Sequence, residues 1–340
     1  MRRRAFVNGS LAALAGAAGR RLGGQDAQES GAPLRLRTAL GWIPATKAGI
    51  VLPHEHLFSS FGLDVAPRHE YDVERLRANV APYLAYLREL GCGTLMDCTT
   101  AYFGRDATLL RELSKTSGLN VVTNTGYYGA AGDRYVPAHA YEESAEQLAA
   151  RWLDEWRGGI DGTDIRPGFI KTGVDPGPLS EIDRKLVSAA ALTHGESGLT
   201  IACHTSDSPE SAFEQLAILK ERRVSPKAWV WVHAHNVQDV GALVRAAEAG
   251  AWIELDGLGP RSLDLHLERV LELRKRGLLG HVLLSHDGDH FPASLGAPRP
   301  SDALFTTFRH VLLDRGLSGS EVEQLVETNP VEAFSIRVRT

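Results

Sequence analysis

The chain has 340 residues, 43% hydrophobic and 23% charged, with a formal net charge of −5. This is an ordinary globular composition, and the length suits one α/β barrel. An acidic chain without a basic stripe argues against a nucleic-acid binder, and no apolar run reaches the ~20 residues that span a bilayer. Three cysteines are too few for a disulfide framework and are expected to be buried free thiols.

The first residues have the pattern of an export signal. Three arginines at positions 2–4 precede a modest Ala/Leu run and a group of small residues. The segment RRAFV at 3–7 is similar to the twin-arginine signature, which directs folded proteins across a bacterial membrane. A disordered basic arm is the alternative. We expect 1–35 to be this signal with a flexible connector, 36–340 to form one domain, and the mature protein to be periplasmic or extracellular, away from the membrane.

Strand and helix patterns alternate along the rest of the chain. Short apolar runs predict strands at 49–52, 94–100, 120–128, 168–174, 200–205, 229–235, 252–258 and 281–287. Amphipathic runs predict helices at 72–90, 106–117, 142–156, 180–195, 209–223, 237–249 and 263–276. Eight apolar strands that alternate with helices imply a closed (β/α)8 TIM barrel of class α/β. An open doubly wound sheet is the alternative, but no Gly-rich dinucleotide fingerprint follows the first strand.

The first predicted strand runs into His54, Glu55 and His56. Because side chains alternate along a strand, the two histidines point the same way and Glu55 points away. Two imidazoles on one face can both reach one divalent cation, for which imidazole nitrogen is a good ligand. For an isolated His-x-His, two surface histidines in a loop are the alternative.

Residue types that bind metals recur where later strands end. These residues are Lys171, His204, His233, His235, His286 and Asp287. Each alone has an ordinary explanation, such as a buried histidine, a lysine with a packed apolar stem, or a helix-capping aspartate. In a closed barrel, however, the C-terminal ends of all strands face one mouth. The sequence therefore predicts that these side chains converge on one cavity.

Taken together, these segments resemble the phosphotriesterase family of the amidohydrolase superfamily, binuclear metal hydrolases that include phosphotriesterases and phosphotriesterase-like lactonases. The resemblance extends from GIVLPHEH at 49–56 to NPVEAF at 329–334 and includes GCGTLMDCT, GFIKTG and LLSHD. It implies two divalent metal ions, zinc first, with manganese, iron or cobalt as alternatives that the same ligands accept.

The resemblance implies a role for each strand-end residue. The implied metal ligands are His54, His56, Lys171, His204, His233 and Asp287. The first-strand histidines and Asp287 would hold one ion, and His204 and His233 would hold the other. Lys171, carboxylated by carbon dioxide, would bridge both ions as a carbamate. Asp287 would accept the proton of a hydroxide-forming water that bridges the ions.

The sixth strand leaves an ambiguity, because His233 and His235 share a face and only one need bind the second ion. We choose His233, since it lies deeper in the strand and its distance from the fifth-strand histidine fits the family better. His235 would then point into the substrate pocket or contact a metal ligand from behind. Tyr127 and Tyr128, from the end of the third strand, are expected to line the pocket, and packing of one of them against a neighbouring loop is the alternative. Asp256, at the end of the seventh strand, would belong to a proton relay or an ion pair.

The resemblance implies hydrolysis of a small ester, lactone or phosphotriester, and a lactone or carboxylic ester is favoured over an organophosphate. Gly257 stands where phosphotriesterases and lactonases commonly carry a basic residue, and the loop after it is short. Fold and metal site do not determine specificity. Amide or phosphodiester hydrolysis on the same metals, and a non-catalytic binding protein, are the alternatives. A homodimer is common in the family, but nothing in the chain demonstrates one.

Overall fold

The computed structural model describes residues 33–294 and 296–340. The twin-arginine motif at 3–7 lies outside the described residues, so export stays a prediction. Among the residues that are described, no helix is both long enough and apolar enough to cross a membrane.

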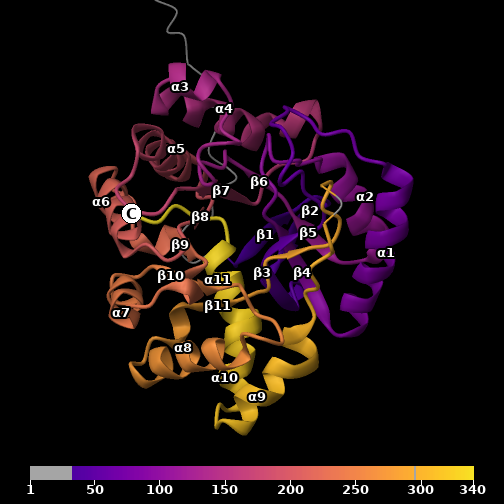
Figure 1. Ribbon diagram of the computed structural model, residues 1–340, viewed down its shortest axis with the longest axis vertical. Coiled ribbons are helices and arrows are strands. Elements are labelled where there is room, and N and C mark those ends of the chain that lie inside the picture. Colours follow the sequence, from indigo (N-terminus) through magenta and orange to yellow (C-terminus); the bar gives the residue numbers. More distant parts are fainter. Residues whose placement is uncertain (1–32, 295) are drawn as a thin grey trace, which may run out of the picture.

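The strands form a closed parallel barrel with helices around its outside (Figure 1). One sheet contains, in order, β11 (Val282–Leu284), β10 (Trp252–Leu255), β9 (Trp229–Val232), β8 (Ile201–His204), β7 (Phe169–Gly173) and β6 (Asn124–Thr125). The other contains β12 (Gly288–Asp289), β3 (Ile50–His56), β4 (Cys92–Asp97) and β5 (Asn120–Val122). Neighbouring strands within both sheets are parallel. The predicted (β/α)8 barrel is confirmed.

The two sheets join into a ring because the third and eighth barrel strands are each interrupted. β5 pairs with β4, and after Thr123 the same chain continues as β6 and pairs with β7. Thr123 O accepts a hydrogen bond of 2.7 Å from Gly168 N, which bridges this first seam. At the second seam β11 pairs with β10 and β12 with β3, and Asp287 N donates to His54 O over 3.1 Å. Both seams are therefore held by backbone hydrogen bonds.

Helices cover the outside of the barrel. They are α1 (Val73–Glu89), α2 (Ala107–Ser117), α4 (Ala145–Gly158), α5 (Glu181–Ser197), α6 (Pro209–Glu221), α7 (Val240–Glu248) and α8 (Leu263–Lys275). Each overlaps the helix predicted for its part of the chain. Polar residues such as Asp72, Asp106 and Ser180 begin them, with side chains that accept a hydrogen bond from the first turn. Shorter helices are α3 (His139–Glu142), α9 (Arg309–Asp314), α10 (Gly319–Glu323) and α11 (Asn329–Phe334).

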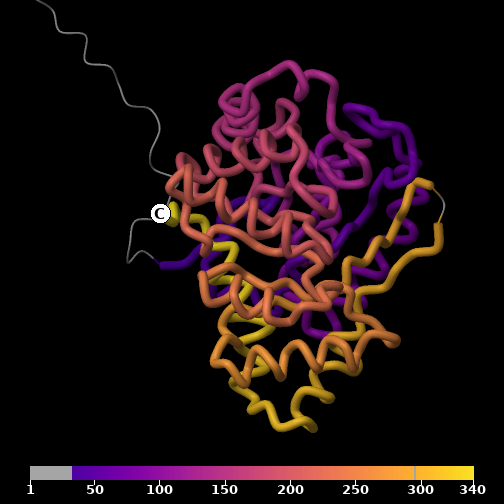
Figure 2. Tube along the Cα trace, turned by 60° about the vertical axis from the view of Figure 1, so that its left-hand side comes forward, coloured from indigo at the N-terminus to yellow at the C-terminus, as the bar shows by residue number. Residues whose placement is uncertain are grey.

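The N-terminal end of the barrel is closed by apolar side chains. Inward-facing strand residues such as Val51 and Leu283 form one buried cluster with Leu36 and Phe334. Leu36 belongs to a hairpin of β1 (Arg35–Thr38) and β2 (Gly41–Pro44), and Phe334 belongs to α11. Figure 2 shows the C-terminus on the same side as the indigo start of the described chain. The polar strand-end residues therefore lie at the opposite end of the barrel.

Candidate metal centre

His54 and His56 lie within β3, where an irregular register turns both toward the interior. Val51 faces the inner cluster, so strict alternation would turn Glu55 inward as well. The pairing with β4 shifts between Leu52 and Glu55, which reverses the alternation. Glu55 instead faces the eighth strand and accepts hydrogen bonds there, including one of 2.8 Å from Gly288 N. The two histidines face the mouth together, as predicted.

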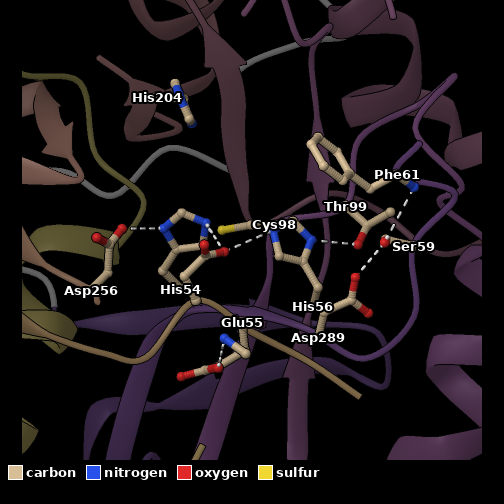
Figure 3. Close-up of polar contacts among 12 residues, drawn as sticks. His54, Glu55, His56, Ser59, Phe61, Cys98, Thr99, His204, Asp256 and Asp289 are labelled. Carbon is tan, nitrogen blue, oxygen red and sulfur yellow. Dashed lines mark hydrogen bonds and ion pairs between the residues drawn. The ribbon is translucent and has the colours of Figure 1, made fainter. Parts of the chain in front are cut away.

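The Nε2 atoms of His54 and His56 converge on one carboxylate. They lie 3.5 and 3.4 Å from Oδ1 of Asp287, which follows β11. Figure 3 shows the two imidazoles side by side, with Asp256 on the far side of His54. Ligand atoms of these three residues lie close enough together to hold one ion. The first predicted ligand set is thus assembled from the two ends of the chain.

Hydrogen bonds determine which nitrogen of each ring carries the proton. Thr99 donates from its hydroxyl to Phe58 O over 2.9 Å, so its oxygen accepts from Nδ1 of His56, 2.8 Å away. Nδ1 of His54 donates to Oδ2 of Asp256 over 2.5 Å. Both rings therefore carry a proton on Nδ1, so in the neutral form that binds a metal ion each presents the lone pair of Nε2 toward Asp287.

His204 and His233 form a second pair beside the first. Their ring centroids are 4.3 Å apart, and the ring of His233 lies 5.0 Å from that of His54. Nδ1 of His233 donates to Oδ1 of Asp256 over 2.9 Å. Burial, and then the neighbouring His233 and Lys171, hold the pKa of His204 well below its ordinary value. A neutral imidazole is the form that binds a metal ion.

Lys171 lies buried in β7, at the same end of the barrel. Its Nζ is 5.4 Å from the centre of the Tyr128 ring, and the Tyr128 hydroxyl lies 3.0 Å from Nδ1 of His204. The amine makes no hydrogen bond or ion pair with any residue that the structure describes. A buried ammonium without a partner is costly. An anionic carbamate at this amine, between two cations, would remove that cost, so the surroundings of Lys171 fit the implied ligand.

The structure corrects the expected strand geometry of His233 and His235. β9 ends at Val232, and His233 has a left-handed backbone with φ of 64°. His235 lies in a 3-10 turn (Ala234–Asn236), so the two histidines do not share a strand face. The His235 ring stacks at 5.2 Å on His266, and a Cβ added to Gly257 would lie 2.2 Å from its Nε2. His233 lies next to His204, whereas His235 lies above Gly257.

Two of the predicted residues do not join this cluster. The ring of Tyr127 packs at 5.5 Å against Trp152, and its hydroxyl lies 3.0 Å from Nε2 of His139. This placement departs from the expectation that both tyrosines line the pocket, because β6 ends at Thr125 and Tyr127 lies beyond the strand, where its ring packs against a helix residue. His286 likewise points away from the mouth, and its Nδ1 donates to Glu55 Oε1 over 2.9 Å.

Sequence reasoning missed two residues that border the histidines. Thr99, one of the polar residues that follow β4, accepts the Nδ1 proton of His56. Glu254 lies within β10, and its Oε2 is 3.3 Å from Nδ1 of His54. Burial, together with the nearby charge of Asp256, raises the pKa of Glu254 to about 7. An acid within the apolar stretch WIELDGL was the available signal.

The donor set fits divalent transition metals. Imidazole nitrogens and carboxylate oxygens suit zinc and its neighbours, and Nε2 of both His54 and His56 is directed at Asp287. Cys92, Cys98 and Cys203 are buried free thiols, and none belongs to either group of possible ligands found among the described residues.

The chain is similar in sequence and in structure to known proteins of one family. The sequence profile of the phosphotriesterase family matches residues 34–334. The phosphotriesterase homology protein of Escherichia coli (strain K12) is 31% identical over 296 residues, covering 84% of this chain and 98% of that protein. Its crystal structure, complexed with phosphate in the active site, has a TM-score of 0.73 at 29% identity and covers 85% of this chain and 99% of that chain.

Two further relatives are named for their hydrolytic activity. The aryldialkylphosphatase of Saccharolobus solfataricus is 28% identical over 253 residues, covering 72% of this chain and 78% of that protein. The N-acetyltaurine hydrolase of Mus musculus is 26% identical over 347 residues, covering 89% of this chain and 98% of that protein. These similarities support a metal-dependent hydrolase acting on small molecules.

Proposed function

Because the chain belongs to the phosphotriesterase family, we propose that this metal-dependent hydrolase cleaves a lactone or carboxylic ester at a centre of two divalent ions. The observation that carries the proposal is the convergence of His54 and His56 on Asp287, with Nε2 of each histidine within 3.5 Å of the same carboxylate oxygen. Their Nδ1 protons are already committed to other partners.

The two ions, zinc first, would be held by residues from five barrel strands. These residues are His54, His56, Lys171, His204, His233 and Asp287. Once its neutral amine has added carbon dioxide and released a proton to water, Lys171 would offer a carbamate oxygen to each ion. The bound ions would lower the pKa of water and stabilise the negative charge that develops on the substrate.

Asp287 would act as the proton acceptor. Burial raises the pKa of Asp287, but the close contact with His56 and the electrostatic influence of the neighbouring His54 and His233 outweigh burial and hold the pKa below its ordinary value. The carboxylate is therefore ionised at neutral pH and able to accept a proton from the attacking water. Its side chain is 24% exposed, which leaves a path for that proton to solvent.

Aromatic side chains beside the ligands would bind the apolar part of the substrate. Tyr128 stacks on Phe103 at 5.2 Å with an interplanar angle of 8°, and Phe103 also contacts His56. Phe61 contacts Phe103 from the rim and is 50% exposed. His235, above Gly257, would contact the substrate from the sixth strand.

Amide hydrolysis is the second candidate. It is favoured by the match to an N-acetyltaurine hydrolase over 89% of this chain. The same ligand residues would serve, because an amide carbonyl is attacked in the same way as an ester carbonyl.

The test is a substrate panel on zinc- or cobalt-loaded protein containing lactones, aryl esters, N-acyl amides and dialkyl aryl phosphates. We expect the highest kcat/KM on a lactone or ester, and Asp287→Asn should lower it roughly 100-fold or more. Asp239→Asn, at an exposed carboxylate, is the control and should leave it unchanged. A higher kcat/KM on the amides would favour the second candidate, and no turnover by fully loaded protein would refute both.

A further inference from the structure

One buried carboxylate contacts a histidine from each of the two ligand groups. Asp256 follows β10 and is inaccessible to solvent. Its Oδ2 accepts from Nδ1 of His54 over 2.5 Å, and its Oδ1 accepts from Nδ1 of His233 over 2.9 Å. Figure 3 shows the first of these contacts. His54 belongs to the group around Asp287, and His233 belongs to the pair with His204.

The chemistry of a carboxylate fixes the state of both rings. An ionised carboxylate has no proton to donate, so each imidazole facing it must carry its own proton on Nδ1. In the neutral form that binds a metal ion, each ring then has its lone pair on Nε2. Asp256 also holds the backbone at the end of β9, because His233 N donates to Oδ2 over 3.3 Å. His56 does not depend on Asp256, since Thr99 accepts its Nδ1 proton.

We propose that Asp256 is a positioning residue shared by the two ion sites, which sets the ligating tautomer of one histidine in each. The inference rests on the two-ion centre of the proposed function. It adds that neither ion site is independent of the other, because one side chain outside the ligand set orients a ligand of both.

Glu254, which lies within β10 two residues before Asp256, provides a matched comparison. It is as deeply buried as Asp256 and its Oε2 lies 3.3 Å from Nδ1 of His54. Neither of its carboxylate oxygens accepts a hydrogen bond within the described part of the chain. Glu254 therefore does not determine the tautomer of His54, and Glu254→Gln is the control for removing a buried carboxylate from β10.

Asparagine at position 256 gives an asymmetric prediction. Oδ2 faces His54 Nδ1 and the backbone N–H of His233, whereas Oδ1 faces Nδ1 of His233 and, at 3.1 Å, Nδ1 of His235. The single oxygen of asparagine should take the place of Oδ2, because a backbone N–H can only donate, whereas an imidazole nitrogen that faces the amide NH2 can accept in its other tautomer. The amide NH2 then faces Nδ1 of His233, so that ring must carry its proton on Nε2 and can no longer bind an ion there. Asp256→Asn should lower the affinity for one of the two ions roughly 10–100-fold or more, whereas Asp256→Ala should lower the affinity for both.

The experiment is equilibrium dialysis in zinc buffers with elemental analysis, which yields two successive dissociation constants for each protein. Circular dichroism melts of the metal-free forms test folding. We expect the wild type and Glu254→Gln to bind two ions with similar pairs of dissociation constants. Asp256→Asn and Thr99→Val should each bind one of the two ions more weakly than the wild type. Because asparagine matches aspartate in shape, Asp256→Asn carries the test if the alanine variant does not fold.

The outcomes separate this inference from the proposed function. A wild type that binds fewer than two ions overturns the two-ion centre, and the shared role of Asp256 with it. If the wild type binds two ions but a folded Asp256→Asn keeps both constants within about threefold, the positioning role is overturned while the proposed function stands. If Asp256→Asn binds both ions more weakly by the same factor and its metal-free form melts at a lower temperature, Asp256 has a general structural role instead.

Discussion

His233 and Asp287 both have left-handed backbone conformations, with φ of 64° and 52°. Such a conformation costs a non-glycine residue roughly 1–2 kcal/mol. Val232 faces the inner cluster, so a continued strand would turn His233 outward. The left-handed turn brings its ring inward, and the backbone amides of His233 and Asp287 are held by Asp256 and His54. The strain is located where two of the proposed ligands are oriented.

At position 233, replacement of the side chain should remove one metal ion. His233→Ala is expected to lower the zinc content from two equivalents toward one, because its ring lies 4.3 Å from that of His204. His235→Ala should keep two equivalents, since the His235 ring stacks on His266 instead. Elemental analysis of both variants after gel filtration measures this. The reverse result would exchange the two assignments.

Gly257 and His235 should be coupled energetically. A Cβ at Gly257 would lie 2.2 Å from Nε2 of His235, so Gly257→Ala should lower the free energy of unfolding by about 1–3 kcal/mol. In a His235→Ala background the same substitution should cost much less. Chemical denaturation of the four proteins measures the coupling.

Gly259 is the control for this cycle, because a Cβ there meets nothing within 4 Å. Gly259→Ala should change the stability by less than about 0.5 kcal/mol. If Gly257→Ala costs the same with and without the His235 ring, that ring does not occupy the space above Gly257.

Among the elements, the C-terminal tail after α11 forms hydrogen bonds with α5 and with the end of α11. Arg339 donates from its guanidinium to Ala333 O and Ser335 O, and its backbone N donates to Nε2 of His194 over 2.9 Å. Nδ1 of His194, in α5, donates in turn to Leu199 O over 2.8 Å. This arrangement requires a neutral imidazole, because Nε2 must accept.

His194 should therefore make stability depend on pH. Burial lowers the pKa of His194 to about 4, and the nearby charge of Arg339 acts in the same direction. Its folded pKa lies below the ~6.5 of an unfolded histidine, so the unfolded state binds the proton first as pH falls. The stabilisation is present above about pH 6.5 and is lost toward pH 4.

The measurement is urea denaturation of metal-free wild type and His194→Gln at about pH 7 and about pH 4.5. Between these pH values the free energy of unfolding of the wild type should fall by ~2.5 kcal/mol more than that of the variant, which has no imidazole to protonate. If the free energy of unfolding falls by the same amount in the two proteins, His194 is not the source of this pH dependence.

For the whole molecule, the candidate centre links parts of the chain that are far apart in sequence. His54 lies near the start of the described chain, Lys171 near its middle and Asp287 near its end. His54 and Asp287 also lie on either side of the seam where the barrel closes. A metal ion bound by these residues would therefore resist separation of the first strand from the eighth.

Removal of metal should lower the stability of the entire domain. At a free zinc concentration 100 times its dissociation constant, one ion should add about 2.7 kcal/mol to the free energy of unfolding. Thermal melts with zinc and with a chelator measure the difference. In Asp287→Ala, most of the stabilisation by the ion bound at His54 and His56 should be lost. Magnesium should not stabilise the wild type as zinc does. Identical melts with zinc and with chelator would contradict a bound ion in the folded state.

Periodicity along the chain was sufficient to predict the barrel and to place the candidate residues at its mouth. Strands that are apolar on both faces must be covered, and the C-terminal ends of parallel strands meet at one rim. These are local patterns, so His54, His56, His204 and Asp287 could be selected before any contact was known. That His54 and His56 face the same way was also predicted correctly, although the register shift that turns both inward was not predicted.

The tertiary structure decided which side chains turn toward one another and which atoms they present. The left-handed turn at His233, the outward packing of Tyr127 and the bond from His54 to Asp256 depend on residues brought together by folding. Strand alternation describes only the repeating backbone and cannot include a turn at a strand end or a proton placed by a partner 202 residues away. For that reason the ligand types could be read along the chain, whereas their orientation required the closed barrel.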